Sequence, residues 1–216
     1  MNDFELTRCD FTVNIDVGSQ KDVVSYIRVL QNIGKVSGFE PKFDEEDYAR
    51  GIHADRSFDL INANGIEFSI YNKWKQSDRA KAKNILRAEV RLFKQKAINK
   101  YTKKAKTADK IRDMAKQCES IFMKTFRRIV PAGDHYTMAQ AEKRISDNVS
   151  HVAQREKMIK LLNLTRKNSL YESLKKLNDK NADRILSKFA KIDVSPILLK
   201  KQYNMKYLCS LYKFLK

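Results

Sequence analysis

The sequence predicts an α+β protein, with a small antiparallel sheet backed by helices and followed by a C-terminal helical lobe. Three stretches in the first half of the chain alternate apolar and polar residues, which is typical of half-buried strands. From Lys94 onward, apolar residues recur instead at helical spacing. Pro131 and Gly133 interrupt this helical part, so we expect two domains, over residues 1–130 and 131–216.

The first predicted strand spans residues 7–17, where the odd positions are apolar and the even positions are polar. A helix is expected next. Ser19 followed by Asp22 is typical of an N-cap, and apolar residues then recur every three or four positions up to Gly34. Residues 36–56 contain turn formers and an acidic run, which predicts an irregular or edge segment.

The second and third polar-faced strands are predicted over residues 65–73 and 85–93 by the same alternation. A short strand at 58–61 precedes them, and the turn residues at 62–65 predict a hairpin. The basic stretch 74–84 connects the two polar-faced strands. If the strands are neighbours in one sheet, their polar faces bring Asp, Glu, Tyr and Arg together, and we expect a functional site there.

Helices are expected in the rest of the chain. An apolar stripe from Ala105 to Phe122 predicts one helix of about 25 residues that ends before Pro131. Thr137 and Gln140 form a capping box for the next helix. Two of the later helices resemble a helix-turn-helix, although helix pairs occur in any small bundle. The later helices are predicted at 149–167, 169–177, 180–190 and 203–215.

The chain is strongly basic, with a formal net charge of +18. Residues 1–73 contain 8 Lys and Arg against 13 Asp and Glu, whereas residues 74–216 contain 36 against 13. This charge favours a nucleic acid over an acidic small molecule as partner. The three cysteines are widely spaced, which indicates neither a disulfide framework nor a zinc site, and no apolar run is long enough to span a membrane. We therefore expect a cytoplasmic protein with no membrane partner.

Two acidic residues on the predicted polar faces suit a divalent cation. Asp10 and Glu89 could hold Mg²⁺ or Mn²⁺, because these ions take carboxylate oxygens together with phosphate oxygens. Arg8, Arg87 and Arg91 lie on the same faces and could clamp a phosphate. The alternative is that these arginines pair with the two carboxylates within the sheet.

Tyr71 lies on the polar face of the second predicted strand, and Lys73 follows two positions later. Such a tyrosine can attack phosphorus when a metal ion and a lysine stabilise the developing charge. The alternative is a tyrosine that only packs against its neighbours. The chain contains no glycine-rich phosphate loop, Ser-His-Asp order or Cys-x-x-Cys pair, so neither an ATPase nor a thiol enzyme is expected.

Basic residues interleaved with aromatic residues follow the second strand and continue beyond the third. Cations attract the phosphate backbone and exposed aromatic rings stack on bases, so the pattern favours binding of single-stranded nucleic acid. A solvated helix face is the alternative. The predicted nucleic-acid-binding residues are Arg8, Trp74, Lys75, Arg79, Lys81, Lys83, Arg91, Lys94, Lys96, Lys100, Tyr101, Lys103, Lys104, Arg127 and Arg128.

Three motifs, in order, resemble those of rolling-circle replication initiators from small plasmids and phages. They are R-x-D at Arg8–Asp10, Y-x-K at Tyr71–Lys73 and R-x-E-hydrophobic-x-L at Arg87–Leu92. The resemblance covers roughly residues 4–100. The helical remainder is similar in layout to the C-terminal part of phage and plasmid replication proteins of Gram-positive bacteria.

The resemblance implies an endonuclease that nicks one DNA strand during replication and keeps the 5′-phosphate on a tyrosine. Tyr71 would be the nucleophile. Asp10 and Glu89 would bind Mg²⁺ or Mn²⁺, and Lys73 and Arg87 would support the developing charge.

Several features of this function stay open in the sequence. Tyr101 competes with Tyr71 for the role of nucleophile. The expected partner is single-stranded or hairpin DNA, with RNA as the other nucleic acid. The alternative function is a catalytically inactive phage or plasmid protein that binds nucleic acid or a host nucleoprotein complex, and regulates or inhibits a host nuclease of a defence system.

Overall fold

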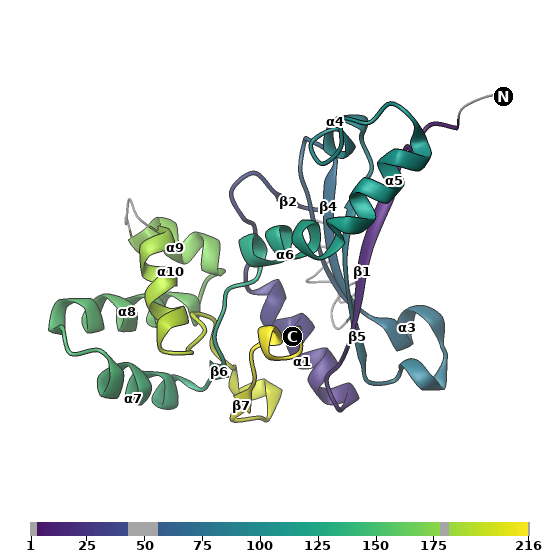
Figure 1. Cartoon of the computed structure of the whole chain (residues 1–216). Helices are drawn as coiled ribbons and strands as arrows, with labels where there is room; N and C mark the ends of the chain where they lie inside the picture. Colours follow the sequence, from purple (N-terminus) through teal and green to yellow (C-terminus); the bar gives the residue numbers. More distant parts are fainter. Residues whose placement is uncertain (1–3, 43–55, 178–181, 216) are drawn as a thin grey trace. The chain divides into compact units, whose positions relative to one another are not determined.

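The fold combines one antiparallel sheet with helices, which confirms the α+β prediction (Figure 1). The computed structural model describes residues 4–42, 56–177 and 182–215. Most of the predicted irregular segment 36–56 therefore lies outside the described residues. The sheet strands are β1 (Cys9–Asp16), β2 (Glu40–Pro41), β3 (Ser57–Ile61), β4 (Ile66–Asn72) and β5 (Ile85–Leu92), in the spatial order β1-β5-β4-β3-β2.

The chain divides into two compact units. The sheet unit comprises Met1–Ile15 and Lys35–Ile129, and the helical unit comprises Asp16–Gly34 and Val130–Lys216. The predicted domain boundary at residue 130 coincides with the point after Ile129 where the chain passes from the sheet unit to the helical unit. The helix predicted after Ser19, however, belongs to the helical unit, although it lies within the predicted domain 1–130.

The three predicted polar-faced strands are β1, β4 and β5, and β5 lies between the other two. β3 and β4 form the predicted hairpin. In its turn Gly65 adopts a φ of +88°, and its N–H donates to the Asn62 carbonyl at 3.1 Å. The register places Ser69 of β4 opposite both Asp59 of β3 and Glu89 of β5, so the polar faces adjoin.

One strand end differs from the prediction. β4 stops at Asn72, because the Asn72 side chain accepts a hydrogen bond from the Lys75 N–H at 3.2 Å and caps helix α3 (Lys73–Ser77). A short 3₁₀ helix, η1 (Ala80–Ala82), follows in the connection to β5. Lys73 therefore begins a helix, and its placement on the polar strand face was wrong.

The apolar face of the sheet packs against helix α6 (Cys118–Ile129). Phe68 of β4 meets Phe126 of α6 edge to face, with ring centroids 6.1 Å apart, and both side chains are fully buried. The alternation of β4 therefore directs Phe68 to the core and Tyr71 to the opposite face. That opposite face carries the candidate site.

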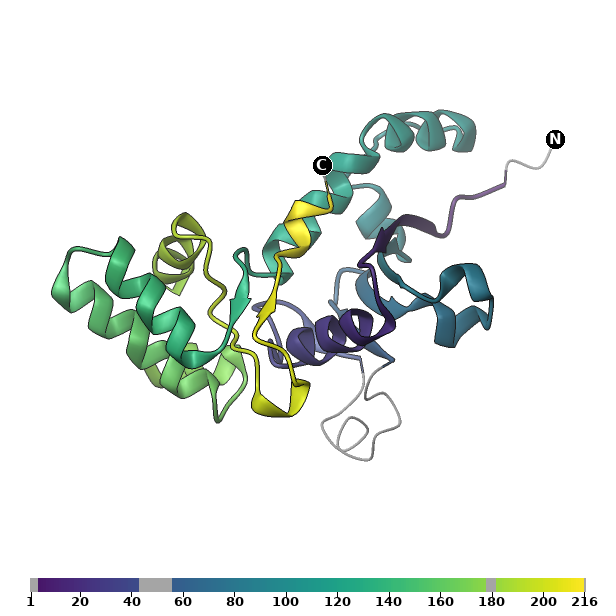
Figure 2. The same cartoon turned by 90° about the horizontal axis from the view of Figure 1, so that it is seen from below.

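The predicted helix of about 25 residues is instead two helices, α5 (Thr107–Lys116) and α6, which run in succession in Figures 1 and 2. The break lies at Gln117, where the N–H donates to the Met114 carbonyl and the regular spacing is lost. The predicted apolar stripe was wrong as a consequence. Ile111 is 52% exposed, whereas Met114 is buried. A four-residue helix, α4 (Gln95–Ile98), precedes them.

The helical unit is built around the predicted capped helices. Ser19 accepts from the Asp22 N–H, and Thr137 and Gln140 form the predicted capping box. The turn of the predicted helix-turn-helix, at 178–181, lies outside the described residues. The helices are α1 (Gln20–Gln31), α7 (Met138–Asn148), α8 (Val152–Thr165), α9 (Leu170–Leu177) and α10 (Ala182–Lys191).

The predicted C-terminal helix at 203–215 was wrong. The segment instead contains η2 (Lys201–Tyr203), β7 (Tyr207–Leu208) and η3 (Leu211–Lys213), and β7 pairs with β6 (His135–Tyr136). The buried carboxylate of Asp134 accepts from the Ser210 N–H at 2.8 Å and from Lys213 Nζ at 2.7 Å. These bonds hold the segment to β6, because an unpaired buried carboxylate would be costly.

Candidate functional site

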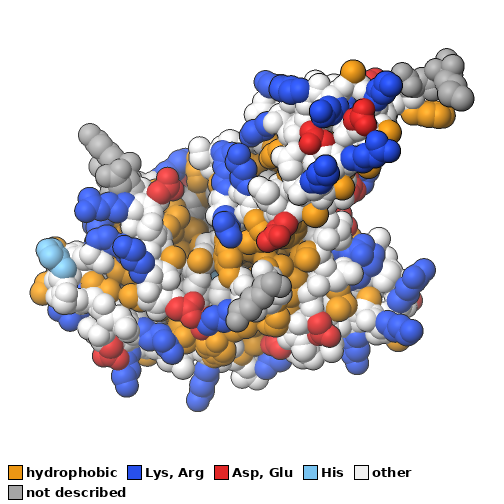
Figure 3. All heavy atoms as spheres, viewed as in Figure 1, with side chains coloured by type: hydrophobic (Ala, Val, Ile, Leu, Met, Phe, Trp, Pro, Cys, Tyr) orange, Lys and Arg blue, Asp and Glu red, His pale blue; other side chains and the backbone are white. Residues whose placement is uncertain are grey.

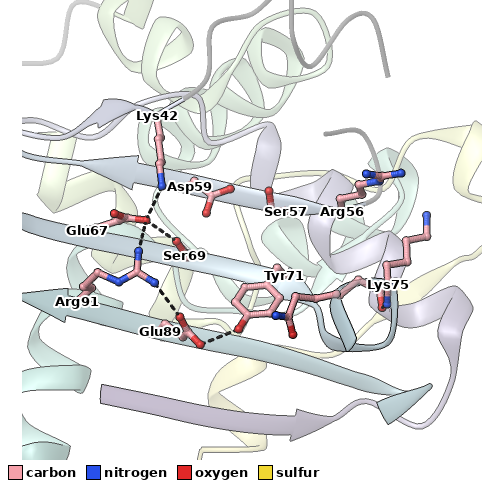
Figure 4. A pocket seen from close by; sticks show the side chains of 12 residues that line it. Lys42, Arg56, Ser57, Asp59, Glu67, Ser69, Tyr71, Lys75, Glu89 and Arg91 are labelled. Carbon is pink, nitrogen blue, oxygen red and sulfur yellow. Dashed lines mark hydrogen bonds and ion pairs between the residues drawn. The ribbon is translucent and has the colours of Figure 1, made fainter. Parts of the chain in front are cut away.

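A cavity lies on the polar face of the sheet (Figure 4). Its volume is about 410 Å³, which is large enough for a small ligand or part of a larger one. Carboxylates, hydroxyls and cations alternate along its walls. The lining residues are Lys42, Arg56, Ser57, Asp59, Glu67, Ser69, Tyr71, Asn72, Lys75, Gln76, Glu89 and Arg91.

Tyr71 and Glu89 form a pair inside the cavity. The Tyr71 hydroxyl donates to Glu89 Oε1 at 2.7 Å, and Figure 4 shows the ring reaching from β4 to the β5 carboxylate. Burial, followed by this hydrogen bond, raises the pKa of Tyr71 to about 12. The phenol is therefore protonated near neutral pH, and Glu89 is the group placed to accept its proton.

Arg91 joins three carboxylates from three strands. Its guanidinium donates to Glu67 Oε1 at 2.9 Å, to Asp10 Oδ2 at 3.3 Å and to Glu89 Oε2 at 3.4 Å. Lys42 is a second cation at this place, and its Nζ donates to Glu67 Oε1 at 3.0 Å. Arg91 is the cation that contacts all three carboxylates, which would otherwise repel one another in a partly buried place.

Asp10 is held by arginines on two sides. Arg8 donates to both of its carboxylate oxygens, at 2.9 and 2.5 Å, while Arg91 approaches from β5. The hydrogen bond from Arg8 is the largest influence on Asp10 and lowers its pKa below the ordinary value. Asp–Arg pairing within the sheet, which the sequence left as the alternative to a metal site, is therefore present in the structure.

The carboxylates of the predicted metal ligands, Asp10 and Glu89, are already bonded to arginine in this arrangement. Asp10 and Glu89 both bond to Arg91, and among the described residues no group of three His, Cys, Asp or Glu could hold a metal ion. The Mg²⁺ or Mn²⁺ site stays a prediction.

Arg87 lies opposite Tyr71 in the register of β4 and β5. Its Nε donates to Asn14 Oδ1 of β1 at 2.8 Å, and its Nη1 lies 3.8 Å from Glu89 Oε1. The hydrogen bond from Arg87 also lowers the pKa of Tyr71, against the larger effects of burial and Glu89. Arg87 therefore lies beside the Tyr71–Glu89 pair, and its role in supporting developing charge stays a prediction.

The sequence reasoning missed Asp59, which is only 7% exposed. It lies on β3 opposite Ser69, and burial raises the pKa of its carboxyl group. A signal existed: Ser57 and Asp59 alternate with Phe58 and Leu60, which is the same period-two pattern that marked the other strands.

Lys73 and Trp74 lie on α3 outside the cavity lining, and Lys73 Nζ hydrogen-bonds to Gln76. Lys75, in contrast, lines the cavity. Tyr101 is half-buried outside the cavity, and burial raises its pKa. Tyr101 is therefore not close to the carboxylates that surround Tyr71.

Most of the predicted nucleic-acid-binding cations are exposed. Figure 3 shows Lys and Arg side chains gathered around α4 and α5 on the face that it draws. Arg128 is partly engaged in the fold, since it donates to the Ser37 carbonyl at 2.6 Å and lies over the Phe39 ring. The exposed predicted cations outside the cavity include Arg79, Lys81, Lys83, Lys94, Lys96, Lys100, Lys103, Lys104, Arg127 and Arg128.

No helix in the described ranges is long and apolar enough to cross a membrane. Comparison of the chain with protein-family models, with curated proteins and with solved structures found no match.

Proposed function

We propose that the cavity on the polar sheet face binds a single strand of DNA, and that Tyr71 attacks one of its phosphodiesters. The observation that carries this proposal is the 2.7 Å hydrogen bond from the Tyr71 hydroxyl to Glu89 inside a cavity that also contains Arg91 and Lys75. A nucleophile bonded to a base, next to cations that attract phosphate, is the arrangement that phosphoryl transfer requires.

The proposed step needs no group beyond these residues and the DNA to account for its proton and its bonds. The Tyr71 oxygen forms a bond to phosphorus while its proton passes to Glu89. The bond from phosphorus to the 3′ oxygen breaks, and that oxygen leaves as a hydroxyl after taking the proton from Glu89. The 5′-phosphate then stays on Tyr71. Arg87 and Arg91 stabilise negative charge on the phosphate, because guanidinium groups bind its oxygens in pairs.

The exposed cations around η1, α4 and α5 support the binding part of the proposal. Their side chains are exposed, and exposed cations attract a phosphate backbone. Affinity should therefore fall steeply as the salt concentration rises. This function fits a plasmid or phage replication initiator, as the resemblance of the three motifs implies.

The test is incubation of the purified chain with labelled single-stranded and hairpin DNA and with Mg²⁺ or Mn²⁺, followed by a denaturing gel. The wild type should give a covalent protein–DNA band. Tyr71→Phe should give none, because it lacks the nucleophilic oxygen, and it should still bind DNA.

The matched control is Tyr101→Phe, which makes the same change at a tyrosine outside the cavity. This variant should retain the covalent band. A band that persists in Tyr71→Phe and disappears in Tyr101→Phe would assign the nucleophile to Tyr101 and refute the role of Tyr71.

A second function is favoured by the charge pairing. The pKa of Tyr71 is raised to about 12, and the carboxylates predicted to bind metal are already bonded to arginine. Both features suit a protein that binds nucleic acid, or a host nucleoprotein complex, and regulates or inhibits a host nuclease without cutting. Salt-sensitive binding with no covalent band, on a panel of strands with both metal ions, would select this function.

A further inference from the structure

The helices α8, α9 and α10 of the helical unit carry a strong positive charge. Residues 152–177 and 182–191 contain 10 Lys and Arg against 3 Asp and Glu. Most of these cations are exposed, and Figure 3 shows Lys and Arg side chains over this part of the surface. Such an excess of positive charge attracts a polyanion. The cavity is not part of this surface, because all of its lining residues belong to the sheet unit.

α10 has one buried face and one exposed basic face. Ile185 and Phe189, four positions apart, are 3% and 0% exposed and pack in the hydrophobic core of the helical unit. Arg184, Ser187 and Lys191 follow one another at i, i+3 and i+7 on the other side of the helix, and all three are exposed. The core therefore fixes the orientation of α10 and directs its basic face to solvent.

The basic face combines long cations with small side chains. Ser187 lies between Arg184 and Lys191, and Ala190 beside them is also exposed. Arg184 and Lys191 are about 10 Å apart along the helix axis, at 1.5 Å per residue. Asp183, in the first turn, is the single acidic residue of α10. Small side chains let a partner approach the helix backbone closely, while the two cations reach toward phosphates on either side.

We propose that the exposed face of α10 binds duplex DNA by lying in its major groove. That groove is about 12 Å wide and admits one α-helix. Arg184 and Lys191 would contact phosphates, and Ser187 and Ala190 would face the base edges. Duplex RNA does not suit this face, because its major groove is deep and narrow. The site lies in the helical unit, so it adds a second nucleic-acid surface that does not depend on the proposed function of the cavity.

The test compares labelled duplex DNA and duplex RNA of the same sequence, each of about 20 base pairs, which is two turns of the helix. Binding of the full-length protein is measured by fluorescence anisotropy over a range of salt concentrations. The two duplexes have the same number of phosphates and differ in groove shape. The wild type should bind the DNA roughly tenfold more tightly than the RNA, because only the DNA groove admits the helix.

The variant with both Arg184→Gln and Lys191→Gln removes the two phosphate contacts. It should bind duplex DNA more weakly, and the slope of log affinity against log salt concentration should fall by about 2. The matched control carries Lys201→Gln and Lys206→Gln, which remove two exposed cations of the helical unit outside α10. This control should keep the slope of the wild type.

Ser187→Leu tests whether the helix enters the groove. The change adds bulk at the centre of the exposed face and leaves the charge unaltered. It should weaken binding to duplex DNA several-fold and leave the salt slope unchanged, because no phosphate contact is lost. Circular dichroism melting of each variant establishes that it is folded.

The outcomes separate the two proposals. Equal affinity for DNA and RNA duplexes, or unchanged duplex binding in the α10 variants, would overturn the groove site. The α10 variants should still bind single-stranded DNA as the wild type does, and loss of both activities together would overturn the assignment of a separate surface. A covalent band with single-stranded DNA and no binding of duplex DNA would overturn the groove site and leave the proposed function standing.

Discussion

At the scale of single residues, the site depends on one guanidinium. Arg91 side-chain nitrogens contact Asp10, Glu67 and Glu89, and only 21% of the Arg91 side chain is exposed. Three carboxylates gathered without this cation would repel one another and would be poorly solvated. The same cation therefore both stabilises the sheet and holds Glu89 in position for Tyr71.

The first prediction concerns Arg91→Gln. This variant should lose about 1–3 kcal/mol of unfolding free energy, because three partly buried carboxylates each lose one of their positively charged partners. The measurement is urea denaturation at neutral pH. Arg112→Gln is the matched control: Arg112 pairs with Asp109 on α5, and 76% of its side chain is exposed. That change should fall within about 0.5 kcal/mol of the wild type, and equal losses in the two variants would contradict the prediction.

The same variant has a predicted dependence on pH. The pKa of Asp10 is lowered in the folded protein, so its contribution to stability is present above its ordinary value of 3.8 and is lost as the carboxyl group protonates in acid. Arg8 is the largest cause of this lowering and stays in the variant, while the charge and hydrogen bond of Arg91 supply a further part. The difference between wild type and Arg91→Gln should therefore shrink by the part due to Arg91 as the pH falls below about 4. A constant difference across this range would show that the lost stability comes from packing.

At the scale of elements, caps and turns explain where helices and strands begin and end. Ser19 and Asn72 begin α1 and α3 by accepting backbone N–H groups, and Gln117 separates α5 from α6. The cap at Asn72 also determines the composition of the site. It turns the chain away from the sheet after Tyr71, which takes Lys73 out of the cavity and brings Lys75 in.

The second prediction concerns the turn between α6 and β6. Gly133 has a φ of +107°, and a Cβ atom there would collide with the backbone of Val194 and lie 2.7 Å from the Ser195 nitrogen. Gly133→Ala should therefore cost about 3 kcal/mol or more, from backbone strain plus overpacking. The measurement is the thermal unfolding midpoint.

Gly18→Ala is the matched control for Gly133→Ala. Gly18 has a φ of +87°, but a Cβ atom there meets nothing within 4 Å in the described part of the chain. It should cost only the conformational strain, about 1–2 kcal/mol. If the two alanine variants lose equal stability, the close approach of Val194 contributes nothing to the cost of Gly133→Ala.

At the scale of the whole molecule, the two units are not consecutive in the sequence. α1 lies early in the chain but is part of the helical unit. Tyr26 of α1 donates to the Cys209 carbonyl at 2.7 Å, and the Leu170 N–H donates to the Asn32 carbonyl at 2.7 Å. The N-terminal 130 residues therefore contain a helix that belongs to the helical unit and bonds to residues beyond position 130.

The third prediction follows from this division. A fragment of residues 1–130 should expose the apolar face of α1, where Val23, Ile27 and Leu30 are each at most 2% exposed in the full chain. It should bind the dye ANS more strongly and unfold in urea with a shallower transition than the full chain. Addition of a separate 131–216 fragment should reduce the dye signal. A fragment 1–130 that unfolds as cooperatively as the full chain would contradict the unit composition.

Elements whose signals are local could be predicted from the amino-acid pattern. Period-two alternation identified β1, β4 and β5 and the side chains on their polar faces, and capping residues located α1 and α7. These signals depend on residues within a few positions of one another. The same alternation in β3 was available to reveal Asp59.

The way in which these parts combine could not be predicted from local patterns and is visible only in the folded protein. In the fold, β5 lies between β1 and β4, and Arg91 pairs with three carboxylates. The C-terminal segment forms the short strand β7, and Lys213 holds this segment to Asp134. Each of these outcomes depends on contacts between residues far apart in the chain. The energy of a buried carboxylate depends on which cation lies beside it, and that neighbour is set by strand order and register rather than by local pattern.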